Sequence, residues 1–510
     1  MILENQTKRG LGQSVDWKLI GCYLLLILIG WVNVYSASHA ADGTSALDFA
    51  TRSGKQLVWI VTAFGLAGLI LFVIPARWWE GLAPWLYAGV AFLLVAVIFL
   101  GVEVKGSRSW FAFGPVRFQP AEVSKITTSL LLAVVMSQPN FKISQIKSFI
   151  LTALVIALPM LIILGEKETG SALVYAGFIF VLYREGLSGW WLALIGLVIL
   201  LFITTLTLSP YTSIVILIAV LCICNAFQRP KEFMPWILIG AGVVLVLSLI
   251  PWLWGLLTSH ITAVNELRTN LVTVPEAGAP TGLSKLSFLL KIEPLHILLV
   301  LALGAIPWFT IKSFRERNLF LGLSVATLVA GIVLVFSTDF IFQKVLQDHQ
   351  RKRIEVLLGM KEDLSGVGYN VNQSMIAIGS GGMRGKGFLN GTQTAYGFVP
   401  EQSTDFIFCT VGEEWGFAGC LVVILLYVFL IVRLMLDADK CRESFTRIYG
   451  YCVAACVFMH LFINVGMTIG LMPVIGIPLP LLSYGGSSLW AFTVLIFIFI
   501  ALYRQEKKYF

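Results

Sequence analysis

Ionisable side chains stand at the ends of several long apolar runs of this sequence. Glu122 and Lys125 open one such run three residues apart, so that on a helix they share one face and can pair. A charge in hydrocarbon is costly, which makes each of these residues a candidate for a functional site. A structural ion pair or an interfacial charge is the alternative for each one. The others are Glu166, Lys167, Glu168, Asp405, Glu413 and Glu414.

A glycine-rich stretch over residues 379–387 contains Arg384 and Lys386. It is not a nucleotide-binding loop of the Walker type, because Lys386 is followed by Gly387 rather than by Ser or Thr. Exposed backbone N–H groups and basic side chains still favour anions, so the stretch could bind a phosphate-bearing lipid headgroup. A flexible turn is the alternative. The five histidines are scattered and indicate neither a metal site nor a catalytic triad.

The elements that must position these residues are membrane spans. Hydrophobic residues make up 58% of the 510 residues, charged residues 13%, and the mean hydropathy is +0.87. Soluble domains have about 25% charged residues, so a soluble enzyme is excluded. The net charge of +8 fits basic loops at an anionic membrane surface rather than nucleic-acid binding. The eight cysteines suggest small hydrophobic side chains rather than a disulfide framework.

Fourteen apolar runs approach the length of a membrane span, which is about 20 residues. They lie near residues 18–38, 56–75, 81–102, 121–138, 147–165, 170–184, 188–208, 211–226, 236–256, 292–311, 319–336, 406–433, 446–468 and 488–504. Lys and Arg in the short connecting loops place both termini in the cytoplasm. The polar segments 103–120, 257–291 and 337–405 then lie outside. Most of the candidate charges cluster at that outer side, which indicates either a transporter with a polar cavity or an intramembrane enzyme acting on a lipid-linked substrate.

Several ordered blocks of this sequence resemble the SEDS proteins, the RodA/FtsW family. The segment Pro473-Val-Ile-Gly-Ile-Pro478 is closer to the RodA form than to the FtsW form, in which a Thr-Lys pair is usual. The blocks, spread over about 400 residues, are 108–125, 366–374, 376–393, 399–408, 412–416, 464–467 and 472–488.

The resemblance implies an all-α polytopic membrane protein, with residues 1–510 as one membrane domain. It implies a peptidoglycan glycosyltransferase in the bacterial cytoplasmic membrane, which polymerises lipid II on the outer face during cell elongation and rod-shape maintenance. The implied partners are lipid II, the bilayer and a class B penicillin-binding protein that supplies the transpeptidase. No organic cofactor is implied, and a divalent cation such as Mg²⁺ is one option for activating the attacking hydroxyl.

The resemblance also implies roles for individual residues. The family's essential aspartate, six residues before Tyr369, corresponds to Asp363, as general base or as metal ligand. Arg108, Lys125 and Lys386 are implied contacts for the headgroup or the diphosphate, and Glu122 is expected to hold Lys125. Gln373 and Glu401 are expected to line the cavity.

The chain departs from the family pattern in three places. The proline that usually follows the catalytic aspartate is Leu364 here, and Glu362 is an adjacent alternative base. The acidic role of another block falls to Glu168. The family core has about ten spans of ordinary length, so residues 186–340 are expected to hold inserted spans, with 337–405 as the catalytic loop. The alternatives are a lipid II flippase, a division-type polymerase and a non-catalytic scaffold.

Overall fold

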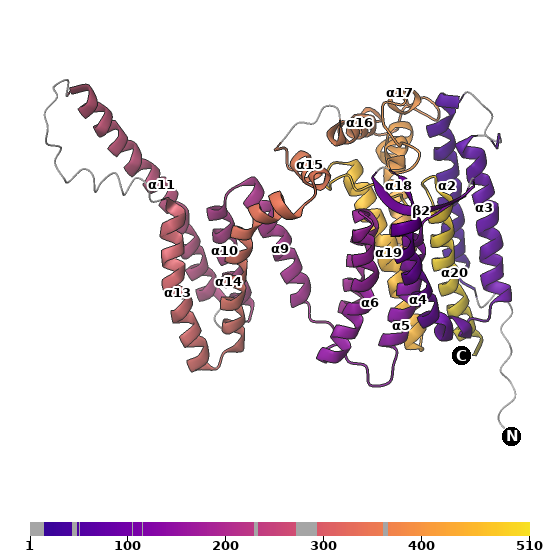
Figure 1. Ribbon diagram of the computed structural model, residues 1–510, viewed down its shortest axis with the longest axis horizontal. Coiled ribbons are helices and arrows are strands. Elements are labelled where there is room, and N and C mark those ends of the chain that lie inside the picture. Colours follow the sequence, from indigo (N-terminus) through magenta and orange to yellow (C-terminus); the bar gives the residue numbers. More distant parts are fainter. Residues whose placement is uncertain are drawn as a thin grey trace. The chain divides into compact units, whose positions relative to one another are not determined.

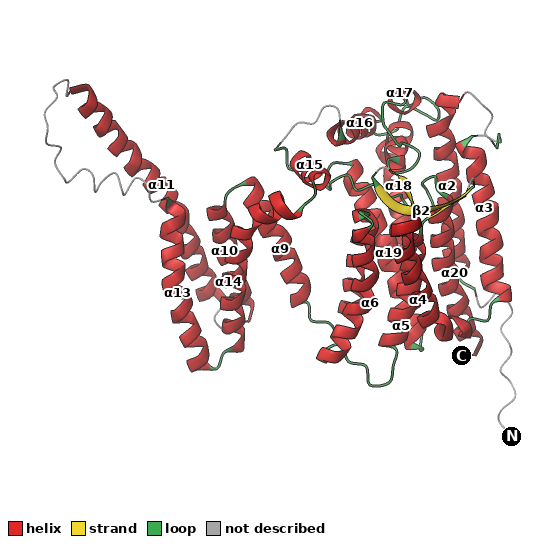
Figure 2. Ribbon diagram, in the orientation of Figure 1, coloured by secondary structure: helices red, strands yellow, loops and turns green. Residues whose placement is uncertain are grey.

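The computed structural model describes residues 15–42, 48–49, 51–104, 106–114, 116–228, 233–271, 293–360 and 366–509. Helices dominate it (Figure 2). In these ranges, 12 helices are long and apolar enough to cross a membrane, which confirms the all-α polytopic fold. The other two of the fourteen predicted runs are also helical but shorter: they form α5 (Pro120–Met136) and the apolar stretch Thr169–Arg184.

The chain divides into two compact units, the first made of residues 1–188 and 352–510 and the second of residues 189–351. Figure 1 labels many of the helices of both units. Besides α5, the first unit contains α2 (Trp17–Asp42), α3 (Arg52–Gly68), η1 (Leu69–Val73), α4 (Arg77–Leu100), α6 (Ile146–Gly165), α7 (Thr169–Val174), η2 (Tyr175–Gly177), α8 (Phe178–Arg184), α16 (Val367–Ser380), α17 (Thr392–Ala395), α18 (Ile407–Asp439), α19 (Ser444–Thr468) and α20 (Gly486–Tyr509).

Three mutually contacting helices, α5, α19 and α20, form the centre of the first unit. In α19, 83% of the most apolar stretch is buried, compared with 22% in α6. Helices such as α6 therefore turn apolar side chains outward, which suits a lipid environment because lipid tails are as apolar as those side chains. Polar residues of the central helices are consequently the ones that protein, rather than lipid, must accommodate.

A small antiparallel sheet joins α4 to α5, in the segment that the sequence indicated only as a polar connection over 103–120. It consists of β1 (Val102–Val104), β2 (Ser107–Phe113) and β3 (Val116–Phe118), in the order β1-β2-β3. Glu103 lies opposite Arg108, and Phe111 lies opposite Phe118. Side chains of a strand alternate between two faces, so Ser107 and Ser109 share one face of β2.

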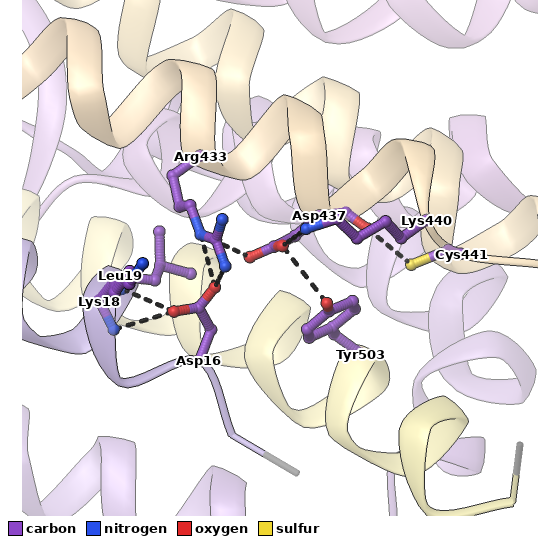
Figure 3. Close-up of polar contacts among 8 residues, drawn as sticks. All are labelled: Asp16, Lys18, Leu19, Arg433, Asp437, Lys440, Cys441 and Tyr503. Atoms are coloured by element: carbon purple, nitrogen blue, oxygen red, sulfur yellow. Dashed lines mark hydrogen bonds and ion pairs between the residues drawn. The ribbon is translucent and has the colours of Figure 1, made fainter. Parts of the chain in front are cut away.

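A polar cluster ties the start of α2 to α18 and α20 (Figure 3). Asp16 caps α2 by accepting hydrogen bonds from the backbone amides of Lys18 (2.9 Å) and Leu19 (3.3 Å). Its carboxylate also accepts a 2.6 Å bond from Nε of Arg433. Burial raises the pKa of Asp16, but hydrogen bonds involving Asp437, Arg433 and the Leu19 amide outweigh burial and lower the pKa to about 2. Asp16 is therefore ionised at neutral pH and fixes the entry into the first span.

The second unit has its own apolar core. Its helices are α9 (Trp190–Thr207), α10 (Pro210–Gln228), α11 (Phe233–Leu271), α13 (Pro294–Glu316), α14 (Leu319–Phe340) and η4 (Ile341–Val345). Core residues include Leu201, Ile214, Leu217, Leu247, Leu298 and Val335. The following helix, α15 (Asp348–Leu357), belongs to the first unit from Lys352 onward. The insertion of spans over residues 186–340 stays a prediction. The second unit, residues 189–351, contains most of this segment.

Candidate functional site

The glycine-rich stretch 382–387 is built into a break in α18. The break is at Gly416, whose φ of 67° and ψ of −163° are not helical. The amides of Lys386 and Gly387 donate to the carbonyls of Glu413 and Glu414 (both 3.0 Å), and the amide of Phe417 donates to the Gly382 carbonyl (2.8 Å). The stretch is thus a backbone-paired part of the fold rather than a flexible turn.

Lys386 and Glu413 fasten this loop by an ion pair. The Lys386 Nζ lies 2.7 Å from Oε1 of Glu413 and donates to the Thr392 hydroxyl at 2.7 Å. Glu413 is fully buried and also accepts from the amides of Gln393 (2.8 Å) and Thr394 (2.9 Å). A buried carboxylate with this many donors is well compensated. The predicted phosphate contact of Lys386 would therefore require it to exchange partners.

Glu122 and Lys125 pair as their spacing predicts, and a histidine completes the group. The Lys125 Nζ lies 2.8 Å from Oε1 of Glu122 and 2.9 Å from Nε2 of His460, with only 2% of Lys125 exposed. The His460 Nδ1 lies 3.1 Å from the carbonyl oxygen of Pro478. A carbonyl only accepts, so Nδ1 carries the proton and Nε2 accepts from Lys125.

His460 was not a candidate from the sequence, because the five histidines are scattered along it. It lies on α19, 335 residues from Lys125. The available signal was its place inside an apolar run, where any ionisable residue has to find a partner. The Lys125 ammonium also lies 5.2 Å from the centre of the Phe492 ring, so the central helices α5, α19 and α20 all contribute to this group.

We expect Lys125→Met to destabilise the protein by about 3–5 kcal/mol, because it leaves the Glu122 carboxylate buried without its cation. The measurement is the midpoint of thermal unfolding in detergent. The double variant Lys125→Met/Glu122→Gln should recover much of the loss, since the uncompensated charge is gone. Losses that simply add in the double variant would show that the two residues do not stabilise one another.

Two further glutamates lie beneath β2, at the junction of α6 and α7. The Ser107 hydroxyl donates to the backbone carbonyl of Glu166, and the Ser109 hydroxyl donates to Oε1 of Glu168, both at 2.7 Å. Glu166 is 2% exposed, and neither of its carboxyl oxygens has a hydrogen-bond partner among the described residues. Burial, together with the nearby Glu168, raises the pKa of Glu166 to about 8. Glu166 therefore carries a proton at neutral pH.

This proton makes stability depend on pH. The ordinary pKa of a glutamate is 4.5 and that of folded Glu166 is about 8, so between these values the folded chain binds more protons than the unfolded chain. Stability should fall as pH rises through this window, by at most about 4–5 kcal/mol. We expect the midpoint temperature of thermal unfolding to be lower at pH 8.5 than at pH 6. The difference should be smaller in Glu166→Gln. An equal drop in both proteins would assign the pH dependence to other groups.

The remaining predicted residues lie in separate surroundings. The Arg108 side chain is 58% exposed and lies 3.5 Å from Glu103. Gln373 is half-buried on α16, and Glu401 is exposed, with the Thr404 hydroxyl donating to its carboxylate at 3.1 Å. Asp363 and its alternative Glu362 lie outside the described residues. The structure therefore gives Arg108, Lys125 and Lys386 three different sets of partners.

The described residues do not offer a ready metal site. Across those ranges no three His, Cys, Asp or Glu side chains are grouped so that they could hold an ion. Asp363, the one predicted ligand, is outside them. Binding of Mg²⁺ therefore stays a prediction, and the described side chains by themselves do not form its site.

Comparison with known proteins gives consistent matches. Residues 16–250 and 292–508 match the family described as "Cell cycle protein", defined on FtsW, RodA and SpoVE. Peptidoglycan glycosyltransferase MrdB of Escherichia coli K12 is 28% identical, covering 91% of this chain and 90% of the relative. Peptidoglycan glycosyltransferase RodA of Treponema pallidum is also 28% identical, covering 93% and 94%. A probable peptidoglycan glycosyltransferase FtsW of Neisseria gonorrhoeae is 24% identical, covering 98% and 86%.

A solved structure has a similar fold. It is described as "Structural coordination of polymerization and crosslinking by a peptidoglycan synthase complex". Its chain is 21% identical, with a TM-score of 0.55, and the match covers 96% of this chain and 98% of that one. At this identity the likeness establishes the fold alone.

Proposed function

Because this chain belongs to the cell cycle protein family of FtsW, RodA and SpoVE, we propose that it is a peptidoglycan glycosyltransferase that polymerises lipid II during cell elongation. The observation that carries the proposal is the family match over residues 16–250 and 292–508. Curated relatives that align with nine-tenths of the chain are peptidoglycan glycosyltransferases. The RodA-type relatives are 28% identical and the FtsW relative 24%, which favours elongation over division.

The proposed reaction joins two lipid-linked sugars. The 4-hydroxyl of the acceptor sugar attacks C1 of the donor sugar, the bond from C1 to the diphosphate breaks, and undecaprenyl diphosphate leaves. Asp363 takes the hydroxyl proton as general base. Cationic side chains stabilise the charge of the departing diphosphate. The proposed contacts are Arg108, Lys125 and Lys386, with Glu122 holding Lys125 and with Gln373 and Glu401 lining the cavity.

The elements that follow Asp363 in the sequence support this assignment. The segment containing Asp363 leads directly into α16, and α16 leads into the loop that Lys386 and Glu413 fasten to α18. A general base has to lie within hydrogen-bond reach of the proton that it takes, so a fixed support on one side favours catalysis. A bound Mg²⁺ would be held by Asp363 and would help to activate the attacking hydroxyl.

The proposed setting is the bacterial cytoplasmic membrane, with both termini in the cytoplasm and Asp363 on the outer side. The 12 apolar helices and the basic short loops support it. The proposed partner is a class B penicillin-binding protein, which would cross-link the strands. Support comes from the structural relative, which is described as a complex that coordinates polymerization and crosslinking.

The deciding experiment measures lipid II polymerisation by the purified chain with its cognate class B partner in detergent. A parallel assay follows lipid II translocation across vesicles that contain the chain alone. Glycan polymer without translocation is the expected result. Translocation without polymer, from a complex confirmed intact, would show that the chain is a flippase rather than a polymerase. The absence of both activities would favour a non-catalytic scaffold.

A further inference from the structure

One cation of the first unit, which was not a candidate from the sequence, forms no hydrogen bond or ion pair with the described residues. Arg353 lies on α15, ten residues before Asp363 in the sequence. It is half-buried, and its Nε is buried with no hydrogen-bond partner among the residues that the structure describes. In the described part of the chain its guanidinium makes neither a hydrogen bond nor an ion pair. Leaving such a group unpaired costs free energy unless a ligand satisfies it.

Two carboxylates attract Arg353 without occupying its donors. They belong to Glu168, at the start of α7, and to Asp405, just before α18. Glu168 accepts a hydrogen bond from the Ser109 hydroxyl, and the backbone carbonyl of Asp405 accepts a 2.8 Å bond from the side-chain Nδ2 of Asn464. Burial lowers the pKa of Arg353, and the two carboxylates partly offset that effect. An arginine stays protonated in proteins, so its charge is retained.

The other candidate cations differ from Arg353. Lys125 is enclosed between Glu122 and His460, and Lys386 is engaged by Glu413 and Thr392. Arg108 is exposed and close to Glu103. Within the described ranges, Arg353 alone among these four combines partial burial with an unpaired donor. The planar guanidinium fork also matches two phosphate oxygens at once, which an ammonium does not.

We infer that Arg353 is a further substrate-contacting residue, which donates hydrogen bonds to the diphosphate of the lipid-linked donor. This inference rests on the proposed glycosyltransferase function. In the reaction, the positive charge of Arg353 stabilises the negative charge that develops on the diphosphate as its bond to C1 breaks. The neighbouring Glu168 and Asp405 hold the guanidinium by charge attraction and leave its N–H groups to the ligand.

The test uses two readouts on the full chain with its partner. One is kcat/KM for lipid II polymerisation, and the other is the rise in melting temperature on addition of undecaprenyl diphosphate. We expect Arg353→Ala to lower kcat/KM by about 10- to 100-fold, as for a lost hydrogen bond to a charged group, and to lose the thermal shift. Arg353→Lys, which keeps the charge but not the fork, should be intermediate. Lys352→Ala, an exposed cation on the same helix, is the matched control.

Each remaining outcome has a clear meaning. The inference would be overturned if the wild type makes polymer and Arg353→Ala equals Lys352→Ala in both readouts. The proposed function would then still stand. A fall in kcat with an unchanged thermal shift would also overturn it, because Arg353 would then act on positioning. If the wild type makes no polymer, the proposed function fails, and the thermal shift still decides whether Arg353 contacts the diphosphate. If Arg353→Ala does not fold, the comparison of Arg353→Lys with the control decides.

Discussion

Asp363→Asn is expected to abolish lipid II polymerisation while leaving the melting temperature unchanged. An asparagine keeps the shape of the side chain, but its amide cannot take the proton of the attacking hydroxyl. General-base catalysis contributes about 10²- to 10⁴-fold, so the rate should fall by at least about 10²-fold. The measurement is the initial rate of glycan formation from lipid II by the complex with the class B partner.

The neighbouring carboxylate is the control for this prediction. Glu362→Gln removes the same charge one residue earlier in the sequence and should retain most of the activity. If Glu362→Gln is inactive and Asp363→Asn is active, the base has been assigned to the wrong residue of the pair. Full activity in both variants would place the base elsewhere, and Glu401 would be tested next.

Gly416→Ala is expected to destabilise the protein through its backbone and its close neighbours. A methyl group at Gly416 would lie 2.3 Å from the Gly385 amide nitrogen and 2.8 Å from that of Arg384. Gly416 also has a φ of 67°, which an alanine adopts only with strain. Overpacking and backbone strain together suggest a loss of about 2–4 kcal/mol. Unfolding in detergent measures the loss directly.

Gly379→Ala is the matched control for this substitution. Gly379 lies in α16 near the same loop, and a methyl group there would meet no other atom within 4 Å. It should leave stability unchanged or raise it slightly, because alanine favours helix. If Gly416→Ala is as stable as Gly379→Ala, the loop would have to accommodate the methyl group, and the close fit of residues 382–387 into the α18 break would not matter for stability.

Several features of the fold could be predicted from the sequence because they depend on neighbours along the chain. Each of the fourteen apolar runs corresponds to a helix, since the length and composition of a run decide whether it can cross a bilayer. Glu122 and Lys125 could be paired because residues three apart lie on one helix face. The three-stranded sheet was missed, because its short strands lie in a segment interpreted only by its polarity.

Other features of the candidate site depend on residues far apart in the chain. The stretch around Lys386 suggested a phosphate-binding loop or a flexible turn, and the structure inserts it into α18 through Glu413. His460 joins Lys125 because α5 and α19 pack together. Arg353 was not singled out, because nothing in the order of residues shows that Glu168 and Asp405 lie near it.

The sequence by itself determined that this chain is a membrane protein, where its helices lie and which family it resembles. These properties follow from local apolar length and from ordered motifs. Only the tertiary structure decided which ionisable side chains are paired, which of the described ones lack a partner and which carry a proton. The physical reason is that the energy of a buried charge depends on groups brought to it by helix packing, and that packing joins residues up to hundreds of positions apart.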